Sequence, residues 1–274
     1  MPRAANPAPA PNPQPTPNPA STAPANLAEL RQRAHALHLP GQLAHWDEAA
    51  SRDWPAQLID WAERERARRS LERRLRDSRV GSFKPLTEFD WLWPKRCDRQ
   101  GVEELMGLAF LREAANVILI GPNGTGKSTI ARNLVYQALR DGHSALFISA
   151  GSLLGELAAT DSASTLSRRL RHFAAFDLLC IDELGYLSYS NRHADLLFEL
   201  TNRRYELRST IITTNRPFAQ WHEVFPNAAC VVSLVDRLLH KAEVIAIEGE
   251  SYRLKEAKQR AAERDQRRKG KPKS

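Results

Sequence analysis

The sequence predicts an α/β protein with a parallel sheet covered by helices on both faces, preceded by a small all-α N-terminal domain. After residue 102, short and continuously apolar runs alternate with stretches of helical periodicity, which is typical of strands buried on both faces of a parallel sheet. Before residue 80, apolar residues recur at helical spacing instead. The length of 274 residues allows one large domain, or a medium domain with a smaller attachment.

The first segment, residues 1–25, holds nine of the seventeen prolines, interleaved with Ala and Asn. Such a chain is extended and has little apolar surface to bury, so we predict a disordered extension. Residues 26–80 are predicted to form the small helical domain, which begins with Leu27 and Leu30. We expect three tryptophans in its core, Trp46, Trp54 and Trp61.

Residues 81–254 are predicted to form the α/β domain. It opens with a connector containing Trp91 and Trp93, whose rings we expect to pin the connector against the neighbouring domain. The strands are expected at 117–120, 145–148, 178–181, 210–213 and 244–247. Residues 255–274 are predicted to be a basic tail that is disordered at its end.

The net charge of +8 is concentrated in two segments, and the remainder of the chain is slightly acidic. Residues 61–79 hold eight Arg against four acidic residues, and residues 255–274 hold nine Lys or Arg against three. Basic segments of this kind usually meet phosphate backbones or other acidic surfaces, and solubility is the alternative explanation.

Membrane spanning and secretion are not expected. No apolar run approaches the roughly 18 residues that a spanning helix needs, and the first residues form no apolar signal segment. The three cysteines, Cys97, Cys180 and Cys230, are odd in number and have no Cys-x-x-Cys spacing, which favours a reducing cytoplasm.

A phosphate-binding loop is predicted at residues 121–128, which read Gly-Pro-Asn-Gly-Thr-Gly-Lys-Ser. They match the pattern Gly-x-x-x-x-Gly-Lys-Ser/Thr at every fixed position and lie between a predicted strand and a helix. Backbone N–H groups and the positive end of the helix would bind phosphate oxygens there, with Lys127 reaching the β and γ phosphates and Ser128 binding Mg²⁺. The predicted nucleotide-binding residues are Gly121, Pro122, Asn123, Gly124, Thr125, Gly126, Lys127, Ser128 and Thr129.

Polar residues follow two further apolar strands. Asp182 and Glu183 end one of them, and two carboxylates at a strand tip need a cation or hydrogen bonds to compensate their burial. We predict that Asp182 binds Mg²⁺ directly or through water, and that Glu183 activates the water that attacks the γ phosphate. Asn215, after the strand at 210–213, is predicted to position this water or to contact the γ phosphate.

These elements, in this order, resemble the AAA+ ATPases, and more narrowly the IstB-like helper ATPases of bacterial transposons, relatives of the DnaC helicase loaders. The resemblance extends over about residues 37–253. Its specific segments are Ile-Asp-Glu-Leu-Gly-Tyr at 181–186, Arg-Tyr-Glu at 204–206, Thr-Asn-Arg-Pro-Phe at 214–218, Asp-Arg-Leu-Leu-His at 236–240 and Gly-Glu-Ser-Tyr-Arg at 249–253.

The resemblance implies a P-loop NTPase fold, ATP and Mg²⁺ as cofactors, and a homo-oligomer with ATP sites between subunits. It places Arg237 at the arginine-finger position, which reaches the γ phosphate held by a neighbour, and Arg253 at the second sensor. Such helpers usually have Thr where this chain has Ser128, and either hydroxyl can serve Mg²⁺.

DNA contact is predicted at a stripe of arginines spaced three, four and three residues apart, Arg66, Arg69, Arg73 and Arg76. One helix face could follow a phosphate backbone without reading sequence. The alternative is ordinary surface ion pairing, because Glu65 and Glu72 lie four residues before two of these arginines. The resemblance favours DNA contact, since its members bind DNA and engage a transposase.

The leading hypothesis is an ATP-hydrolysing, DNA-binding helper that regulates how a transposase engages target DNA. A DnaC-like helicase loader is the runner-up, with client recognition expected in residues 26–80 in either case. A small-molecule kinase with the same phosphate loop, and a DNA-binding scaffold that holds ATP without hydrolysing it, are rivals from other classes.

Overall fold

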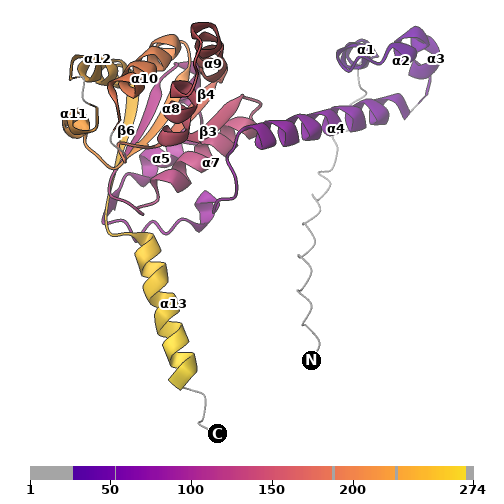
Figure 1. Ribbon diagram of the computed structural model, residues 1–274. Helices are drawn as coiled ribbons and strands as arrows, with labels where there is room; N and C mark the ends of the chain where they lie inside the picture. Colours follow the sequence, from indigo (N-terminus) through magenta and orange to yellow (C-terminus); the bar gives the residue numbers. More distant parts are fainter. Residues whose placement is uncertain (1–26, 53, 187–188, 226–227, 270–274) are drawn as a thin grey trace, which may run out of the picture. The chain divides into compact units, whose positions relative to one another are not determined.

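The computed structural model describes residues 27–52, 54–186, 189–225 and 228–269 (Figure 1). The chain divides into two compact units, residues 1–68 and 69–274, and the division falls inside helix α4 (Trp54–Asp77). The predicted disordered extension, residues 1–25, lies outside the described residues. The domain boundaries at residues 80 and 254 stay predictions.

The first unit is helical over its described residues. Helices α1 (Leu27–Ala36), α2 (Pro40–Ala44), α3 (Trp46–Ala50) and the start of α4 share a small core of Leu30, Ala34, Trp46 and Ile59. The prediction for Trp46 is confirmed, but Trp54 and Trp61 are 48% and 61% exposed. They lie seven residues apart on one face of α4, whereas it is the face carrying Ile59 that packs into the core.

The second unit contains a six-stranded sheet in the order β1-β6-β2-β5-β4-β3. Its five longer strands are parallel where they pair, as predicted, and a two-residue strand pairs antiparallel at the edge beside β6. The strands are β1 (Arg96–Cys97), β2 (Asn116–Ile120), β3 (Ala145–Ser149), β4 (Leu178–Leu184), β5 (Ser209–Thr214) and β6 (Ala242–Glu248).

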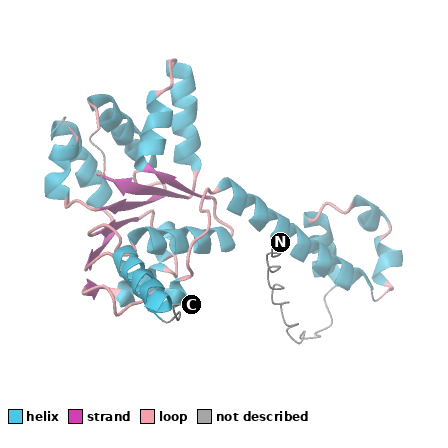
Figure 2. Ribbon diagram, turned by 60° about the horizontal axis from the view of Figure 1, so that its bottom comes forward, coloured by secondary structure: helices cyan, strands magenta, loops and turns pink. Residues whose placement is uncertain are grey.

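Helices cover both faces of the sheet, and side chains alternate between two cores (Figures 1 and 2). In β2, Ile118 enters one core while Val117 and Leu119 enter the other, which requires the near-continuous apolar runs seen in the sequence. One face carries α8 (Ala150–Ala158), α9 (Ala163–Ala175), α10 (Asn191–Arg204), α11 (Trp221–Val224) and α12 (Ala228–Leu239). The other carries α5 (Arg99–Leu105), α6 (Ala109–Arg112) and α7 (Lys127–Arg140).

The connector before the sheet is pinned by its aromatic residues, as expected. Phe89 and Trp91 pack against the core under α7, and the short helix η1 (Leu86–Glu88) is bonded to that helix through Asn133. The Asn133 amide accepts from the backbone N–H of Leu86 at 2.9 Å and donates to the carbonyl of Lys84 at 3.0 Å. The connector therefore lies close to the loop that opens α7.

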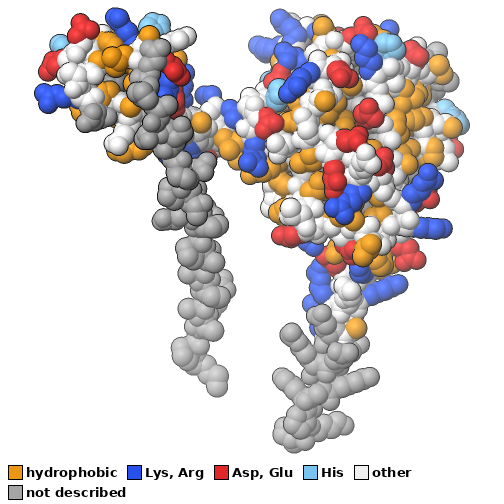
Figure 3. Space-filling view, turned by 180° about the vertical axis from the view of Figure 1, so that it is seen from behind, with side chains coloured by type: hydrophobic (Ala, Val, Ile, Leu, Met, Phe, Trp, Pro, Cys, Tyr) orange, Lys and Arg blue, Asp and Glu red, His pale blue; other side chains and the backbone are white. Residues whose placement is uncertain are grey.

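The last element that the structure describes in the second unit is α13 (Tyr252–Lys269), a continuous helix across the predicted start of the basic tail. A short helix, η2 (Phe218–Gln220), lies between β5 and α11. On the face of the second unit seen in Figure 3, acidic and basic side chains are intermingled, which agrees with the near balance of 19 Lys or Arg against 20 acidic residues in residues 80–254. No helix among the described residues has both the length and the apolar character needed to cross a membrane.

Candidate nucleotide site

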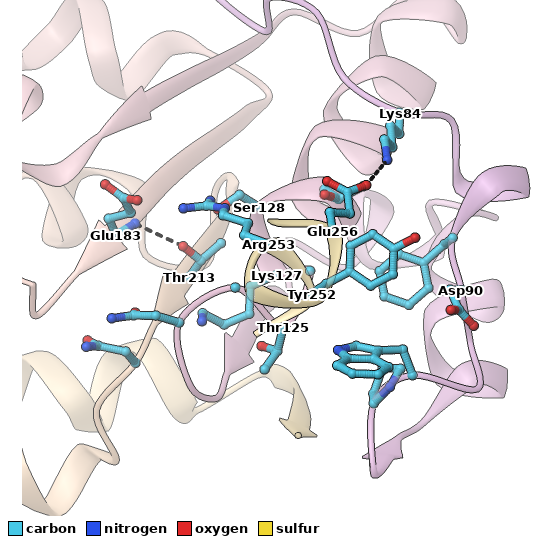
Figure 4. Close-up of a pocket in the computed structure, with 18 of the residues that line it drawn as sticks. Lys84, Asp90, Thr125, Lys127, Ser128, Glu183, Thr213, Tyr252, Arg253 and Glu256 are labelled. Carbon is cyan, nitrogen blue, oxygen red and sulfur yellow. Dashed lines mark hydrogen bonds and ion pairs between the residues drawn. The ribbon is translucent and has the colours of Figure 1, made fainter. Parts of the chain in front are cut away.

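A cavity of about 330 Å³ opens at the carboxyl ends of the parallel strands, within the size range of small-molecule sites. The phosphate loop, the ends of β4 and β5, the connector and the start of α13 all line it. Figure 4 shows Glu183, Thr213, Lys127 and Arg253 toward one end of this space and Tyr252 and Asp90 toward the other.

The loop between β2 and α7 requires glycine at two positions because other chain segments approach it closely. A Cβ on Gly126 would lie 2.4 Å from Cε2 of Phe89, and its φ of 100° is rarely adopted by other residues. A Cβ on Gly121 would lie 2.0 Å from the carbonyl oxygen of Ile247. Packing against the connector and β6 therefore excludes side chains at Gly121 and Gly126.

Lys127 begins α7 and is 8% exposed. Its ammonium donates to the carbonyl oxygens of Gly121 and Pro122, each at 2.7 Å. The pKa of Lys127 is lowered to about 8, chiefly by burial. The nearby Arg253 also lowers it, and the carboxylates of Asp182 and Glu183 oppose both effects. A polyphosphate beside this ammonium would favour its charged form.

Nucleotide affinity is therefore expected to fall as the pH rises above about 8. Below this pH the Lys127 ammonium is charged both before and after binding, so its protonation does not make nucleotide affinity depend on pH. Above it, binding takes up as much as one proton, because a bound anion raises the pKa of Lys127. Calorimetry of ATP binding at pH 8.5 to 9 in two buffers of different ionisation enthalpy measures this uptake.

Lys127→Arg is the matched control for this pH effect, since a guanidinium stays charged throughout the range. The arginine variant should bind without proton uptake. Equal affinity at pH 7.5 and 9.5 in the unchanged protein would contradict the assignment.

A hydrogen-bonded network joins the loop to the tips of β4 and β5. The Ser128 hydroxyl donates to Oδ1 of Asp182 at 2.9 Å, and the Thr213 hydroxyl donates to the same oxygen. Thr213 also accepts from the backbone N–H of Glu183 at 2.9 Å. Asp182 is 6% exposed, so these bonds compensate the burial of its carboxylate.

Thr213 is a site residue that the sequence analysis missed. A threonine near a strand end is read as an ordinary β-branched strand residue, and only its pairing with β4 shows that its hydroxyl serves both acidic residues. The available signal was the polar Thr-Thr-Asn ending directly after Ile211 and Ile212.

Glu183 has a left-handed backbone conformation, with φ of 61°, at an irregularity in the pairing of β4 with β5. Such a conformation is costly for a residue other than glycine and occurs preferentially at functional sites. Its side chain is exposed and lines the cavity, whereas the neighbouring Asp182 is buried. The two carboxylates are thereby separated into a buried one beside Ser128 and one open to the cavity.

The oxygens of Asp182 and Ser128 fit a magnesium ion. No group of three or more His, Cys, Asp and Glu side chains within the described part of the chain is placed to hold a metal. Mg²⁺ is usually bound by one or two protein oxygens, with phosphate oxygens and water completing its coordination. The donor set therefore suits a cation that arrives with a nucleotide.

Asn215 follows β5 and also lines the cavity. Its Oδ1 is buried and has no hydrogen-bond partner among the described residues. A buried amide oxygen without a partner is unfavourable unless a ligand or water donates to it. Asn215 is therefore placed to accept a hydrogen bond from a molecule in the cavity.

The other end of the cavity is formed by the connector and the start of α13. The Lys255 ammonium lies 4.3 Å from the centre of the Trp93 ring and pairs with Asp90 at 2.9 Å. The Trp93 and Tyr252 rings meet edge to face with their centres 6.2 Å apart. Sequence reasoning did not assign these residues to the site, because nothing local indicates that the connector meets the end of the domain.

The backbone of α13 is joined directly to the phosphate loop, since the N–H of Tyr252 donates to the carbonyl of Gly124 at 2.9 Å. Arg253 follows in the first turn and lines the cavity together with Lys127. Its role as second sensor, which the resemblance implies, stays a prediction.

Residues 23–261 match the family model described as IstB-like ATP binding protein. This match covers most of the chain. The chain belongs to the IstB-like family. An insertion sequence IS21 protein of Pseudomonas aeruginosa, named for ATP binding, is 41% identical over 191 residues, which cover 70% of this chain and 72% of that protein. An IS5376 protein of Geobacillus stearothermophilus, named likewise, is 30% identical over 247 residues, covering 86% and 98%.

Among solved structures, DnaI matches this IstB-like chain with a TM-score of 0.50 and 18% identity, covering 61% of the chain and 92% of DnaI. The likeness confirms the predicted fold, a mostly parallel sheet with helices on both faces.

Arg237 of the IstB-like chain does not line the cavity. It lies on α12, where its guanidinium donates to Oδ1 of Asn202 on α10 and lies 4.7 Å from the centre of the Phe198 ring. The structure thus brings together Lys127, Ser128, Asp182, Glu183, Asn215 and Arg253, and leaves Arg237 on another surface of the same unit. Its predicted role in a neighbouring subunit stays a prediction.

The predicted DNA stripe lies on α4. Arg66 belongs to the first unit and donates to the carbonyl of Ala36 at 2.7 Å. Arg69, Arg73 and Arg76 belong to the second unit, and their side chains are exposed. Leu71 and Leu75, on another face of the helix, pack against the core under α7. The exposed arginines are therefore held on a helix whose apolar side is anchored.

Proposed function

We propose that this protein is an ATPase that binds ATP with Mg²⁺, hydrolyses it between subunits, and helps a transposase engage DNA. The observation that carries the proposal is the cavity, in which the phosphate loop, the Ser128–Asp182–Thr213 network, Glu183 and Asn215 converge. Membership of a family of ATP-binding proteins supports the choice of nucleotide.

Each residue of the cavity has a distinct task in this proposal. Backbone N–H groups of the loop and the N-terminal end of α7 bind the phosphates, and Lys127 neutralises the β and γ oxygens. Glu183, open to the cavity, accepts a proton from the attacking water, while Oδ1 of Asn215, which has no partner among the described residues, orients that water. Arg253 adds positive charge beside the same phosphates.

Ser128 and Asp182 would hold the magnesium ion. When bound, the ion neutralises charge on the β and γ phosphates. Thr213 orients the carboxylate of Asp182 by donating to it, and the same hydroxyl holds the backbone of Glu183.

Hydrolysis requires a neighbouring subunit in this proposal because Arg237 lies away from its own cavity. A guanidinium supplied from another subunit stabilises charge that develops on the transferring phosphoryl group. Assembly therefore controls turnover, and hydrolysis can time the release of the assembled form.

The client is inferred from relatives. The proteins at 41% and 30% identity carry insertion-sequence names, which favours a transposase over a replicative helicase as the partner. Co-purification with a replicative helicase, and not with the transposase of its own element, would indicate a helicase loader instead.

The proposal is tested by following phosphate release from ATP over a range of protein concentrations, with and without duplex DNA. We expect the rate per subunit to rise with concentration, because a lone subunit lacks the neighbour's arginine. Accumulation of a phosphorylated small molecule instead of free phosphate would indicate a kinase, and tight ATP binding without turnover under all conditions would indicate a scaffold.

DNA binding is expected to weaken when Arg73 and Arg76 are both replaced by Glu. Loss of two phosphate contacts should lower the slope of log affinity against log salt concentration by about 2, equally for unrelated duplexes. Fluorescence anisotropy with labelled duplexes measures both quantities. Arg168→Glu with Arg171→Glu is the matched control, since these exposed arginines on α9 have the same spacing and the same charge change. Equal weakening of DNA binding by both pairs of substitutions would show that the arginines of α4 are not a particular DNA-binding surface.

A further inference from the structure

Arg237 is held by a specific set of contacts on the surface formed by α10 and α12. Its guanidinium donates to Oδ1 of Asn202, lies 4.7 Å from the centre of the Phe198 ring, and lies 6.0 Å from that of Tyr205. Phe198 and Asn202 lie one turn apart in the second half of α10, and Tyr205 follows directly after its C-terminal end. We call Phe198, Asn202 and Tyr205 the arginine platform.

The platform itself is fixed to the interior. Arg204, between Asn202 and Tyr205 in sequence, is 2% exposed. Its guanidinium donates to the carbonyl oxygens of Phe173, Ala174 and Phe176 at the end of α9 and to the Thr210 hydroxyl in β5. The Tyr205 hydroxyl is bonded to Nδ1 of His240 at 3.0 Å, which ties the end of α10 to the end of α12. The C-terminal end of α10 is therefore anchored in the sheet and against α12.

An arginine side chain has four rotatable carbon–carbon and carbon–nitrogen bonds before its guanidinium, so an exposed one samples many positions. The hydrogen bond to Asn202 and the Phe198 ring beside the guanidinium restrict Arg237 to few of these positions. Catalysis by a charge that must reach another subunit depends on this kind of preorganisation.

We propose that Asn202 is a positioning residue for Arg237, which it orients for the active site of the neighbouring subunit, with the rings of Phe198 and Tyr205 supporting the guanidinium. This inference rests on the proposed function, because it assumes that Arg237 acts in a neighbour. Asn202 acts from the subunit that donates the arginine and has no role in the subunit that holds the nucleotide.

The test uses two inactive variants whose defects lie in different subunits. Lys127→Ala cannot hold the phosphates but still donates Arg237, and Arg237→Ala holds nucleotide but donates no arginine. Mixed in equal amounts, they form interfaces at which both parts are intact, so phosphate release should return. Asn202→Leu, which removes the acceptor oxygen and keeps the size of the side chain and the helical preference of α10, is then added to one partner at a time.

Asn202→Leu placed in the Lys127→Ala partner should lower the recovered rate by roughly 10- to 100-fold, because the donated arginine loses its orientation. The same substitution placed in the Arg237→Ala partner should leave the recovered rate unchanged and is the matched control. In otherwise unchanged subunits, Asn202→Leu should lower kcat and leave KM for ATP unaltered, since the nucleotide cavity is not touched.

The two ideas fail in different ways. If the Lys127→Ala and Arg237→Ala mixture releases no more phosphate than its components, the proposal of an arginine donated between subunits is wrong. If the mixture recovers but Asn202→Leu has no effect, or lowers the rate equally in either partner, Asn202 is not a positioning residue. Equal melting temperatures by circular dichroism for the paired variants confirm that the comparison is made between folded proteins.

Discussion

Replacement of Arg237 by Ala is expected to lower the kcat of ATP hydrolysis by about 10³-fold or more, with nucleotide affinity retained. Arg237 lies on α12 and contacts α10 instead of the cavity, so its loss leaves the phosphate loop, the Ser128–Asp182 pair and Glu183 in place. What is lost is a charge supplied to another subunit. Phosphate release at saturating ATP measures kcat, and calorimetry of ATP binding measures the affinity.

Arg203→Ala is the matched control for this variant. Arg203 lies on α10, in the neighbourhood of the arginine platform, and pairs with Glu199 of the same helix at 2.6 Å. Its removal takes away one surface charge and should change the rate by less than twofold, in keeping with the small contribution of exposed ion pairs, about 0 to 1 kcal/mol. Comparable losses from both substitutions would point to general damage of this surface, and unchanged hydrolysis by Arg237→Ala would end the case for a donated arginine.

Replacement of Glu183 by Gln is expected to lower kcat by roughly 10²- to 10⁴-fold, because the amide cannot take a proton from the attacking water. The side chain of Glu183 is exposed to the cavity, and the backbone N–H that Thr213 holds is unchanged by the substitution. Binding of ATP should therefore persist. Single-turnover phosphate release separates the chemical step from nucleotide exchange and is the measurement of choice.

Glu243→Gln makes the same chemical change on β6, where the side chain is exposed and does not line the cavity. It should hydrolyse ATP at the rate of the unchanged protein. If Glu183→Gln turned over at that rate as well, the acid beside the buried Asp182 would have no part in the reaction, and the scaffold hypothesis would become the better one.

The sheet and the phosphate loop could be predicted because their determinants are local. The five parallel strands are continuous apolar runs, and the glycines and Lys127 stand in a fixed pattern between one strand and one helix. Strand β1 could not be predicted, since two residues with alternating exposure carry no periodic signal and pair only because β6 presents a free edge.

The site was predicted where each strand ends in a polar residue, and missed where its parts come together through packing. Thr213, Trp93 and Tyr252 have ordinary interpretations as a strand residue, a loop residue and a helix start. Their roles depend on which strand pairs with β5 and on the return of the chain from β6 to the connector. The spacing of nearby residues in the sequence predicts neither the strand pairing nor the return of the chain.

The tryptophans of the first unit show the limit of pattern reading in short helices. Trp46 is buried and Trp61 is exposed, although both are large apolar residues among helical repeats. With a core of only a few side chains, one face of α4 suffices to cover it, so hydrophobic identity alone does not decide which tryptophan faces inward.

Helix α13 begins at the cavity and is 18 residues long, so its axis extends about 27 Å at 1.5 Å per residue. Tyr252 bonds to the loop and Arg253 lines the cavity in its first turn, while the rest of the helix continues beyond them. Because α13 is held at its N-terminal end, a change in its direction there moves its C-terminal end by a larger distance. A tilt of about 10° at the cavity would move the other end of a helix of about 27 Å by about 5 Å, and the last turns of α13 contain Arg264, Arg267, Arg268 and Lys269.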